Sequence, residues 1–196
     1  MEHSNGLPTP TKVEAPLGID VNGSEANIYW PNSYSSVIGM TLYLASNTRP
    51  DISFAVQQCA LFTHNTKVSH DTDVKRIYRY LKGTKDNVLV FNPYKKMVVD
   101  CYANADFAGL WGHENPQETI CARSRTGFVV TFANFHLLWV SKLQTEIALS
   151  TLHSEYIALS HSVRALLPLK ILIKEVIDNL VIDSDNLKFV SSSTIY

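Results

Sequence analysis

The sequence predicts an α+β fold, with a helical unit in the first half of the chain and a small sheet in the second. From residue 33 onward, apolar side chains recur with the three-to-four-residue spacing of amphipathic helices. From residue 97 the period shortens to two, as in strands with one buried face, and a long helical pattern follows. We therefore expect a lead-in at residues 1–32, a helical segment at 33–92 and a second domain at 97–196.

The composition predicts a globular protein. The 196 residues are 45% hydrophobic and 18% charged, which is enough apolar material for one or two small cores. The net charge of -1 excludes a uniformly basic surface, so nucleic-acid affinity would need a local basic patch. The three cysteines form no CxxC pair, which disfavours a structural zinc site. Because no signal sequence or long apolar run is present, we expect an intracellular protein, cytoplasmic or nuclear, without a membrane partner.

Three helices are expected in the first half. Scattered prolines and glycines make residues 1–32 look like a flexible linker. The dense apolar segment after Ser33 predicts a short, largely buried helix, although its periodicity also fits a strand. A second helix is expected with Thr48 as its N-cap. A third is expected from Ser69 to a left-handed cap at Gly83.

The second half is expected to form a three-strand meander, a long helix and a fourth strand. The strands are predicted at 97–103, 124–132 and 137–149, and the helix at 150–180, with a further strand beginning at 187–190. One side of the helix carries large apolar residues, namely Tyr156, Leu159, Val163, Leu166 and Leu167.

Several motifs closely resemble those of copia-type LTR retrotransposons. The first group resembles reverse transcriptases just downstream of the polymerase palm, and consists of SVIGMTLYL at 36–44, TRPDI at 48–52 and RYLKGT at 79–84. The second group resembles the ribonuclease H motifs of the same elements, in the same order, and consists of ANADFAG at 103–109, SRTGF at 124–128, WVSKLQ at 139–144 and SEYIAL at 154–159.

The resemblance implies a region of a Pol polyprotein that runs from the reverse transcriptase thumb or connection into a ribonuclease H-like domain. The family copies RNA into DNA and cleaves the RNA strand of the RNA/DNA hybrid. The polymerase palm would precede Met1, and Tyr196 falls before the position of a further family aspartate. We therefore expect a fragment with an incomplete, C-terminally truncated ribonuclease H-like domain.

The resemblance also implies a magnesium site built from carboxylates. Ribonuclease H chemistry uses two Mg²⁺ ions, and such hard cations need anionic oxygen ligands. The helix glutamate of the family maps onto Glu155, whereas its first-strand aspartate maps onto Asn104, with Asp106 two residues later on the same face. Glu155 and Asp106 are the candidate catalytic and metal-binding residues. Without the resemblance, Glu155 would be assigned to a solvated surface and Asp106 to a turn.

Asn104 provides no charge, so we expect Mg²⁺ binding to be doubtful and cleavage to be lost. The third expected helix carries Lys75, Arg76, Arg79 and Lys82, which form either a solvated face or contacts with the phosphates of RNA/DNA hybrid or single-stranded nucleic acid. We expect an inactive fragment with weak nucleic-acid binding, whose natural partner is the rest of a Pol polyprotein. Two alternatives are a magnesium-dependent ribonuclease completed in trans and a protein-interaction module.

Overall fold

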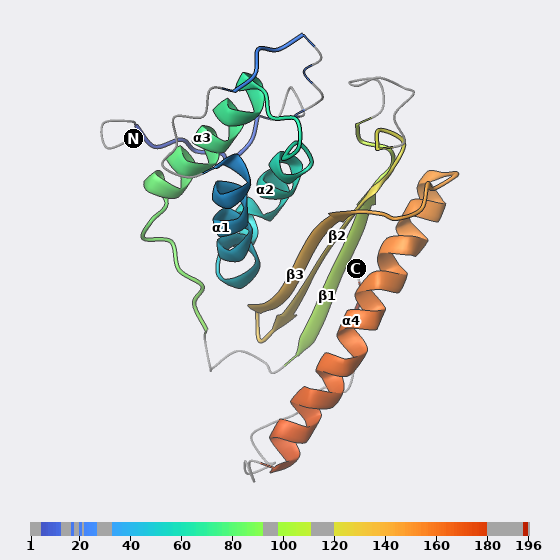
Figure 1. Ribbon diagram of the computed structural model, residues 1–196. Coiled ribbons are helices and arrows are strands. Elements are labelled where there is room, and N and C mark those ends of the chain that lie inside the picture. Colours follow the sequence, from blue (N-terminus) through green and yellow to red (C-terminus); the bar gives the residue numbers. More distant parts are fainter. Residues whose placement is uncertain are drawn as a thin grey trace. The chain divides into compact units, whose positions relative to one another are not determined.

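The computed structural model describes residues 5–12, 17, 20, 22–26, 33–91, 98–110, 120–179 and 194–195 (Figure 1). The chain divides into two compact units: Met1–Val88 with Leu110–Ala122, and Leu89–Gly109 with Arg123–Tyr196. The first contains three helices, and the second contains a sheet and one long helix, so the predicted α+β class is confirmed. Leu110–Ala122 lies inside the range 97–196 that we assigned to the second domain, but it groups with the first unit.

The helices of the first unit are α1 (Tyr34–Asn47), a 3-10 turn η1 (Pro50–Ile52), α2 (Ser53–Ala60) and α3 (Val68–Gly83). The three predicted helices are confirmed, and the first is a helix rather than a strand. It is less buried than expected, because Met40 and Tyr43 are 52% and 73% exposed. The helices of the first unit share one core of chiefly aliphatic side chains and one buried tyrosine. At its centre are Tyr34, Val37, Ile38, Ile52, Val56, Val74 and Ile77.

The predicted ends of two helices are wrong. Thr48 is not the N-cap of the second helix but the C-cap of α1, where its N–H donates to the Leu44 carbonyl over 3.1 Å. α3 begins one residue before the predicted Ser69. Its N-cap is Lys67, whose N–H donates to Nδ1 of His70 over 3.0 Å. The imidazole nitrogen thus takes the acceptor role that a glutamate has in the usual capping box, so the sequence pattern did not reveal it.

Gly83 does not form the predicted left-handed cap. It is the last residue of α3, and Thr84 caps the helix with a φ of -122°. Here glycine is needed for close approach, because a Cβ added at Gly83 would lie 3.2 Å from the Cα of Gly6. The N–H of Leu7 also donates to the Arg79 carbonyl over 3.4 Å. The described residues 5–12 of the predicted flexible lead-in therefore lie against α3.

The sheet of the second unit has the strand order β3-β2-β1-β4. The three strands of the predicted meander are β1 (Val99–Asp106), β2 (Arg125–Phe132) and β3 (Phe135–Leu143), which pair antiparallel. The short strand β4 (Thr194–Ile195) pairs parallel with β1. The fourth strand predicted at 187–190 lies outside the described residues. β3 ends at Leu143 rather than at 149, because the next side chain, Gln144, turns into the interior and is 1% exposed.

α4 (Thr151–Asn179) runs along one face of this sheet (Figure 1). Of the apolar residues expected on one side of α4, Leu166 packs against the sheet, whereas Tyr156 and Leu167 are 61% and 55% exposed. The fully buried positions recur every four residues and are mostly small, namely Ser154, Ala158, Ser162 and Leu166. Small side chains let the helix backbone lie close to the strands, while several larger apolar side chains, among them Tyr156 and Leu167, are exposed.

The outward side of α4 is strongly apolar. By length and composition alone, Thr151–Val176 could cross a membrane. A single helix of this kind is weak evidence for a membrane span. In the structure, Leu166 packs in a cluster with Val99, Cys101 and Val130 of the sheet. The contact partner shown by the structure is therefore the sheet.

Candidate functional site

The carboxylate of Glu155 reaches the first strand of the sheet. Its Oε2 accepts the N–H of Ala105 over 3.1 Å. Ala105 stands between Asn104 and Asp106 in β1. The structure therefore brings Glu155 next to the strand segment that carries the other two predicted site residues.

Gln144 fixes the start of α4, and with it the position of Glu155. Its Nε2 donates to the Thr126 hydroxyl over 3.1 Å and to the Ser154 carbonyl over 2.9 Å. Its backbone N–H donates to the Ser124 carbonyl over 2.8 Å. Sequence reasoning used Gln144 only as the end of a motif and missed this role. The available signal was a single glutamine directly after an apolar strand. When such a side chain is buried, it usually has hydrogen-bond partners.

Asp106 is held by the turn that follows β1. Its carboxylate accepts the N–H of Arg125, the residue opposite it in β2. A Cβ added at Gly109 would collide with Oδ2 of Asp106, so the turn closes over this carboxylate. The turn shields the Asp106 carboxylate locally from water and so raises its pKa above the ordinary value, while the Arg125 N–H and the Arg125 charge act in the opposite direction.

Asn104 lies on the same face of β1 as Asp106, because alternate residues of a strand share a face. Cys101 and Ala105, on the other face, are buried, whereas Asn104 and Asp106 are exposed. The Asn104 amide can offer one neutral carbonyl oxygen where the family resemblance implies a carboxylate. Glu155 thus approaches a strand end that carries one acidic side chain rather than two.

The described side chains do not fit a pair of magnesium ions. Within the described ranges, no three His, Cys, Asp or Glu side chains form a group that could hold a metal ion. One oxygen of Glu155 accepts the N–H of Ala105, and the Asp106 carboxylate accepts the N–H of Arg125. Asn104 is uncharged. Magnesium requires several anionic or water oxygens in near-octahedral geometry. The metal-binding roles of Glu155 and Asp106 therefore stay predictions.

The four predicted nucleic-acid contacts lie on α3, and three of them line one cavity. This cavity has a volume of about 470 Å³ and is lined by Leu7, Lys12, Thr72, Asp73, Lys75, Arg76 and Arg79. Lys82 is not among its lining residues. Lys12 comes from the N-terminal segment, and its spacing in the sequence offered no signal for this position. The cavity is described further below.

Comparison with known proteins gives three informative relatives. The chain is 33% identical over 165 residues to the retrovirus-related Pol polyprotein from transposon TNT 1-94 of Nicotiana tabacum, which covers 84% of this chain. It is 32% identical over 126 residues, 64% of this chain, to the retrovirus-related Pol polyprotein from transposon RE1 of Arabidopsis thaliana. It is also 32% identical over 129 residues to the secreted RxLR effector protein 161 of Plasmopara viticola, covering 66% of this chain and 85% of that protein.

The chain belongs to the family of retrotransposon Pol polyproteins. This Pol-family chain spans 11% of the tobacco polyprotein and 8% of the Arabidopsis one. No protein-family model and no solved structure matches it.

In the Pol-family chain, the TRPDI and RYLKGT motifs meet in one hydrogen-bond network. The Arg49 guanidinium donates to both oxygens of Asp51 over 3.0 and 2.7 Å, and to the carbonyl and hydroxyl oxygens of Thr84 over 3.2 and 2.6 Å. The Tyr80 hydroxyl donates to Asp51 over 2.7 Å, and its ring lies 5.6 Å from the Arg49 guanidinium carbon. These residues of the Pol-family chain therefore connect the start of α2 with the end of α3.

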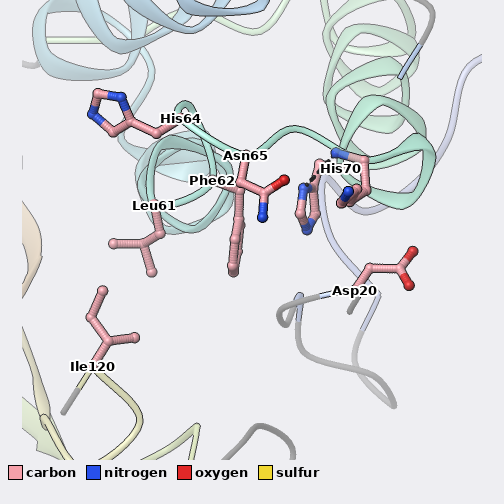
Figure 2. A pocket seen from close by; sticks show the side chains of 8 residues that line it. Asp20, Leu61, Phe62, His64, Asn65, His70 and Ile120 are labelled. Carbon is pink, nitrogen blue, oxygen red and sulfur yellow. Dashed lines mark hydrogen bonds between the residues drawn. The ribbon is translucent and has the colours of Figure 1, made fainter. Parts of the chain in front are cut away.

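A second cavity of the Pol-family chain, of about 210 Å³, lies beside the start of α3 (Figure 2). The Phe62 ring stacks on the His70 imidazole with 4.2 Å between centroids, and Asp20 accepts the Ser69 hydroxyl over 2.9 Å. Asn65 also lines this cavity and is labelled in Figure 2. Because His70 also caps α3, these contacts explain the cavity as part of the helix start, and we assign it no ligand.

Proposed function

We propose that the chain is part of the reverse transcriptase–ribonuclease H region of a copia-type Pol polyprotein, that it binds RNA/DNA hybrid weakly and that it does not cleave hybrid by itself. The observation that carries this proposal is the approach of Glu155 to the β1 segment between Asn104 and Asp106. The resemblance implies carboxylates from a helix and from the first strand at such a site. Here the first strand has an amide in one of these positions.

The order of elements supports the ribonuclease H part of the proposal. The resemblance implies three strands, a helix and a further strand, and the second unit has β1, β2, β3, α4 and β4 in this order. For the reverse transcriptase part, the support from the first unit is that the TRPDI and RYLKGT motifs form one connected hydrogen-bond network. The helical unit and the sheet unit together match the two groups of motifs in their sequence order.

The expected inactivity has an electrostatic cause. Two Mg²⁺ ions held about 4 Å apart repel each other strongly, and the surrounding carboxylates must offset that repulsion. Asn104 removes one of these negative charges at the position that the resemblance places between the two ions. We therefore infer that the described donors cannot keep both ions in working geometry.

A cleavage assay tests the proposed inactivity. The purified chain and its Glu155→Gln variant are incubated with an RNA/DNA hybrid labelled on the RNA strand, with Mg²⁺ and with chelator. We expect no Mg²⁺-dependent cleavage by the unmodified chain beyond the level of the variant. Cleavage that requires Mg²⁺ and disappears in Glu155→Gln would contradict the proposal and support a working ribonuclease. Equal cleavage by both proteins would identify a contaminating nuclease.

The proposed hybrid binding is tested separately by fluorescence anisotropy. Because the contacts are expected to be phosphate contacts, affinity should fall as salt rises. Replacing Lys82 with alanine should weaken binding about two- to threefold and reduce the log–log salt slope by about one charge. Binding that is insensitive to salt, or absent at low salt, would contradict this part of the proposal.

A further inference from the structure

The cavity beside α3 carries an excess of positive charge. Lys12, Lys75, Arg76 and Arg79 line it together with a single carboxylate, that of Asp73. Lys75 is paired with Asp71 at 2.5 Å, but the other three cations form no ion pair with a carboxylate among the described residues. Cations gathered around a hollow raise the local concentration of anions. The cavity is therefore suited to a small, strongly anionic group.

Among the described residues, the hydrogen bonds of the two arginines go to neutral acceptors. Nη2 of Arg76 donates to the Thr9 hydroxyl over 2.8 Å, and Nε of Arg79 donates to the Asn5 carbonyl over 3.0 Å. The Nε of Arg76 is buried and has no acceptor among the described residues. A buried donor without an acceptor is destabilising. An anionic oxygen bound by the accessible part of the guanidinium would compensate the guanidinium charge.

The N-terminal segment is one wall of this cavity. The close approach of Gly6 to Gly83 and the hydrogen bond from Leu7 to the Arg79 carbonyl hold the segment against α3. Thr9 contacts Arg76 from the same segment. Lys12 follows three residues later and brings a further cation to the cavity. The segment therefore adds charge to the basic face of α3 and does not neutralise it.

Asp73 limits the affinity but does not reverse the charge. Burial raises the pKa of its carboxyl above the ordinary value, and the charges of Lys12, Arg76 and His70 act against that shift. Lys12 and Arg76 line the same cavity as Asp73. One carboxylate among these cations leaves a net positive site.

We propose that residues 5–12 and α3 together form a phosphate-binding pocket in which Lys12, Arg76 and Arg79 bind one phosphate group. The inference rests on the nucleic-acid binding proposed above and deepens it. It names phosphate as the group recognised and assigns the N-terminal segment to the site. An arginine fork matches the oxygens of a phosphate, and lysine adds a compact charge. The phosphate belongs either to a nucleic-acid backbone or to a free phosphate ion.

The test compares Lys12→Ala with Lys174→Ala. Both substitutions remove an exposed lysine, and Lys174 lies on α4 in the other unit. Inorganic phosphate is titrated by calorimetry, and fluorescein-labelled RNA/DNA hybrid by anisotropy at fixed salt. We expect Lys12→Ala to weaken phosphate binding about tenfold, and Lys174→Ala to change it less than twofold. Arg76→Lys keeps the charge but loses the fork, so it should weaken phosphate binding as well. Thermal melting checks that each variant is folded.

The outcomes separate the pocket from the proposed function. If Lys12→Ala weakens the binding of both probes, the pocket binds a backbone phosphate. If it weakens only phosphate binding, the pocket serves free phosphate. Hybrid binding that Lys12→Ala and Lys174→Ala reduce equally, without phosphate binding, would overturn the pocket and leave the proposed binding intact. Tighter binding in Lys12→Ala would show that the segment blocks α3, which would also overturn the proposal.

Discussion

Replacing Gln144 with alanine is expected to lower the free energy of unfolding of the second unit by about 3 kcal/mol. The substitution removes the donor to the Thr126 hydroxyl and the Ser154 carbonyl, and both acceptors lie in the interior. It also leaves a cavity, because Gln144 is 1% exposed. The change is measured by urea unfolding followed by circular dichroism, with the slope of the transition checked for constancy.

The matched control for Gln144→Ala is a substitution of Lys142 by alanine. It lies two residues earlier, near the end of β3, and its side chain is exposed, so we expect a change within about 0.5 kcal/mol. A loss of less than about 1 kcal/mol in Gln144→Ala would show that water replaces the amide and that Gln144 does not anchor α4.

Replacing Arg49 with alanine is expected to lower the free energy of unfolding of the first unit by about 3 kcal/mol. Arg49 is 12% exposed in its side chain and donates to four oxygens, two in Asp51 and two in Thr84. Its removal leaves the partly buried Asp51 carboxylate with Tyr80 as its remaining side-chain donor. Hydrogen bonds of charged groups are stronger than neutral ones, so the loss exceeds that of a typical surface ion pair. Urea unfolding measures it.

Arg49→Lys is the control, because it keeps the charge and removes the planar fork. We expect the free energy of unfolding of Arg49→Lys to lie between those of the unmodified chain and Arg49→Ala. Unchanged stability in Arg49→Lys would contradict a role for the hydrogen-bond geometry and leave only a role for the charge.

The same network predicts how stability depends on acid. Burial raises the pKa of Asp51, but the hydrogen bonds from Arg49 and Tyr80 outweigh burial and hold that pKa below its ordinary value. The network therefore stabilises the folded chain above the unfolded-state pKa, and this contribution is lost as pH falls through the lower folded-state pKa. Between about pH 5 and pH 2, Arg49→Ala should thus lose less stability than the unmodified chain.

The helices of the first unit could be predicted because large apolar residues mark their buried sides. The ends could not, since Thr48 has the chemistry of an N-cap and is used as a C-cap, and His70 replaces the usual acidic capping residue. The side of α4 that contacts the sheet was not predicted, for a related reason. Ser154, Ala158 and Ser162 carry little hydrophobic signal, although they are the residues that let the helix approach the sheet.

The β2–β3 turn shows a different limit. Ala133 and Asn134 both have positive φ values, 51° and 65°, in the two-residue connection between the strands. Such a turn is usually marked by Asn-Gly or Asp-Gly. Alanine carries no such mark, so the meander was predicted from strand patterns and the turn type was not.

The candidate site was placed mainly by resemblance. Glu155 could be named because its SEYIAL motif matched a family pattern, whereas the contacts that position it come from Gln144 and Ala105. Lys12 could not be named, since it approaches Arg76 only through the packing of the N-terminal segment on α3. Contacts between residues far apart in sequence leave no periodic trace.

The C-terminal end of α4 depends mostly on its own backbone. Among the helix side chains that the structure describes, Ile173 is the last one packed against the sheet cluster, and Lys174, Glu175 and Val176 are exposed. Pro168 adds a weakness further back, because it has no N–H for the carbonyl one turn earlier. Unpacked helix ends open with little free-energy cost. On warming, we therefore expect the C-terminal part of α4 to open before the turn that carries Glu155.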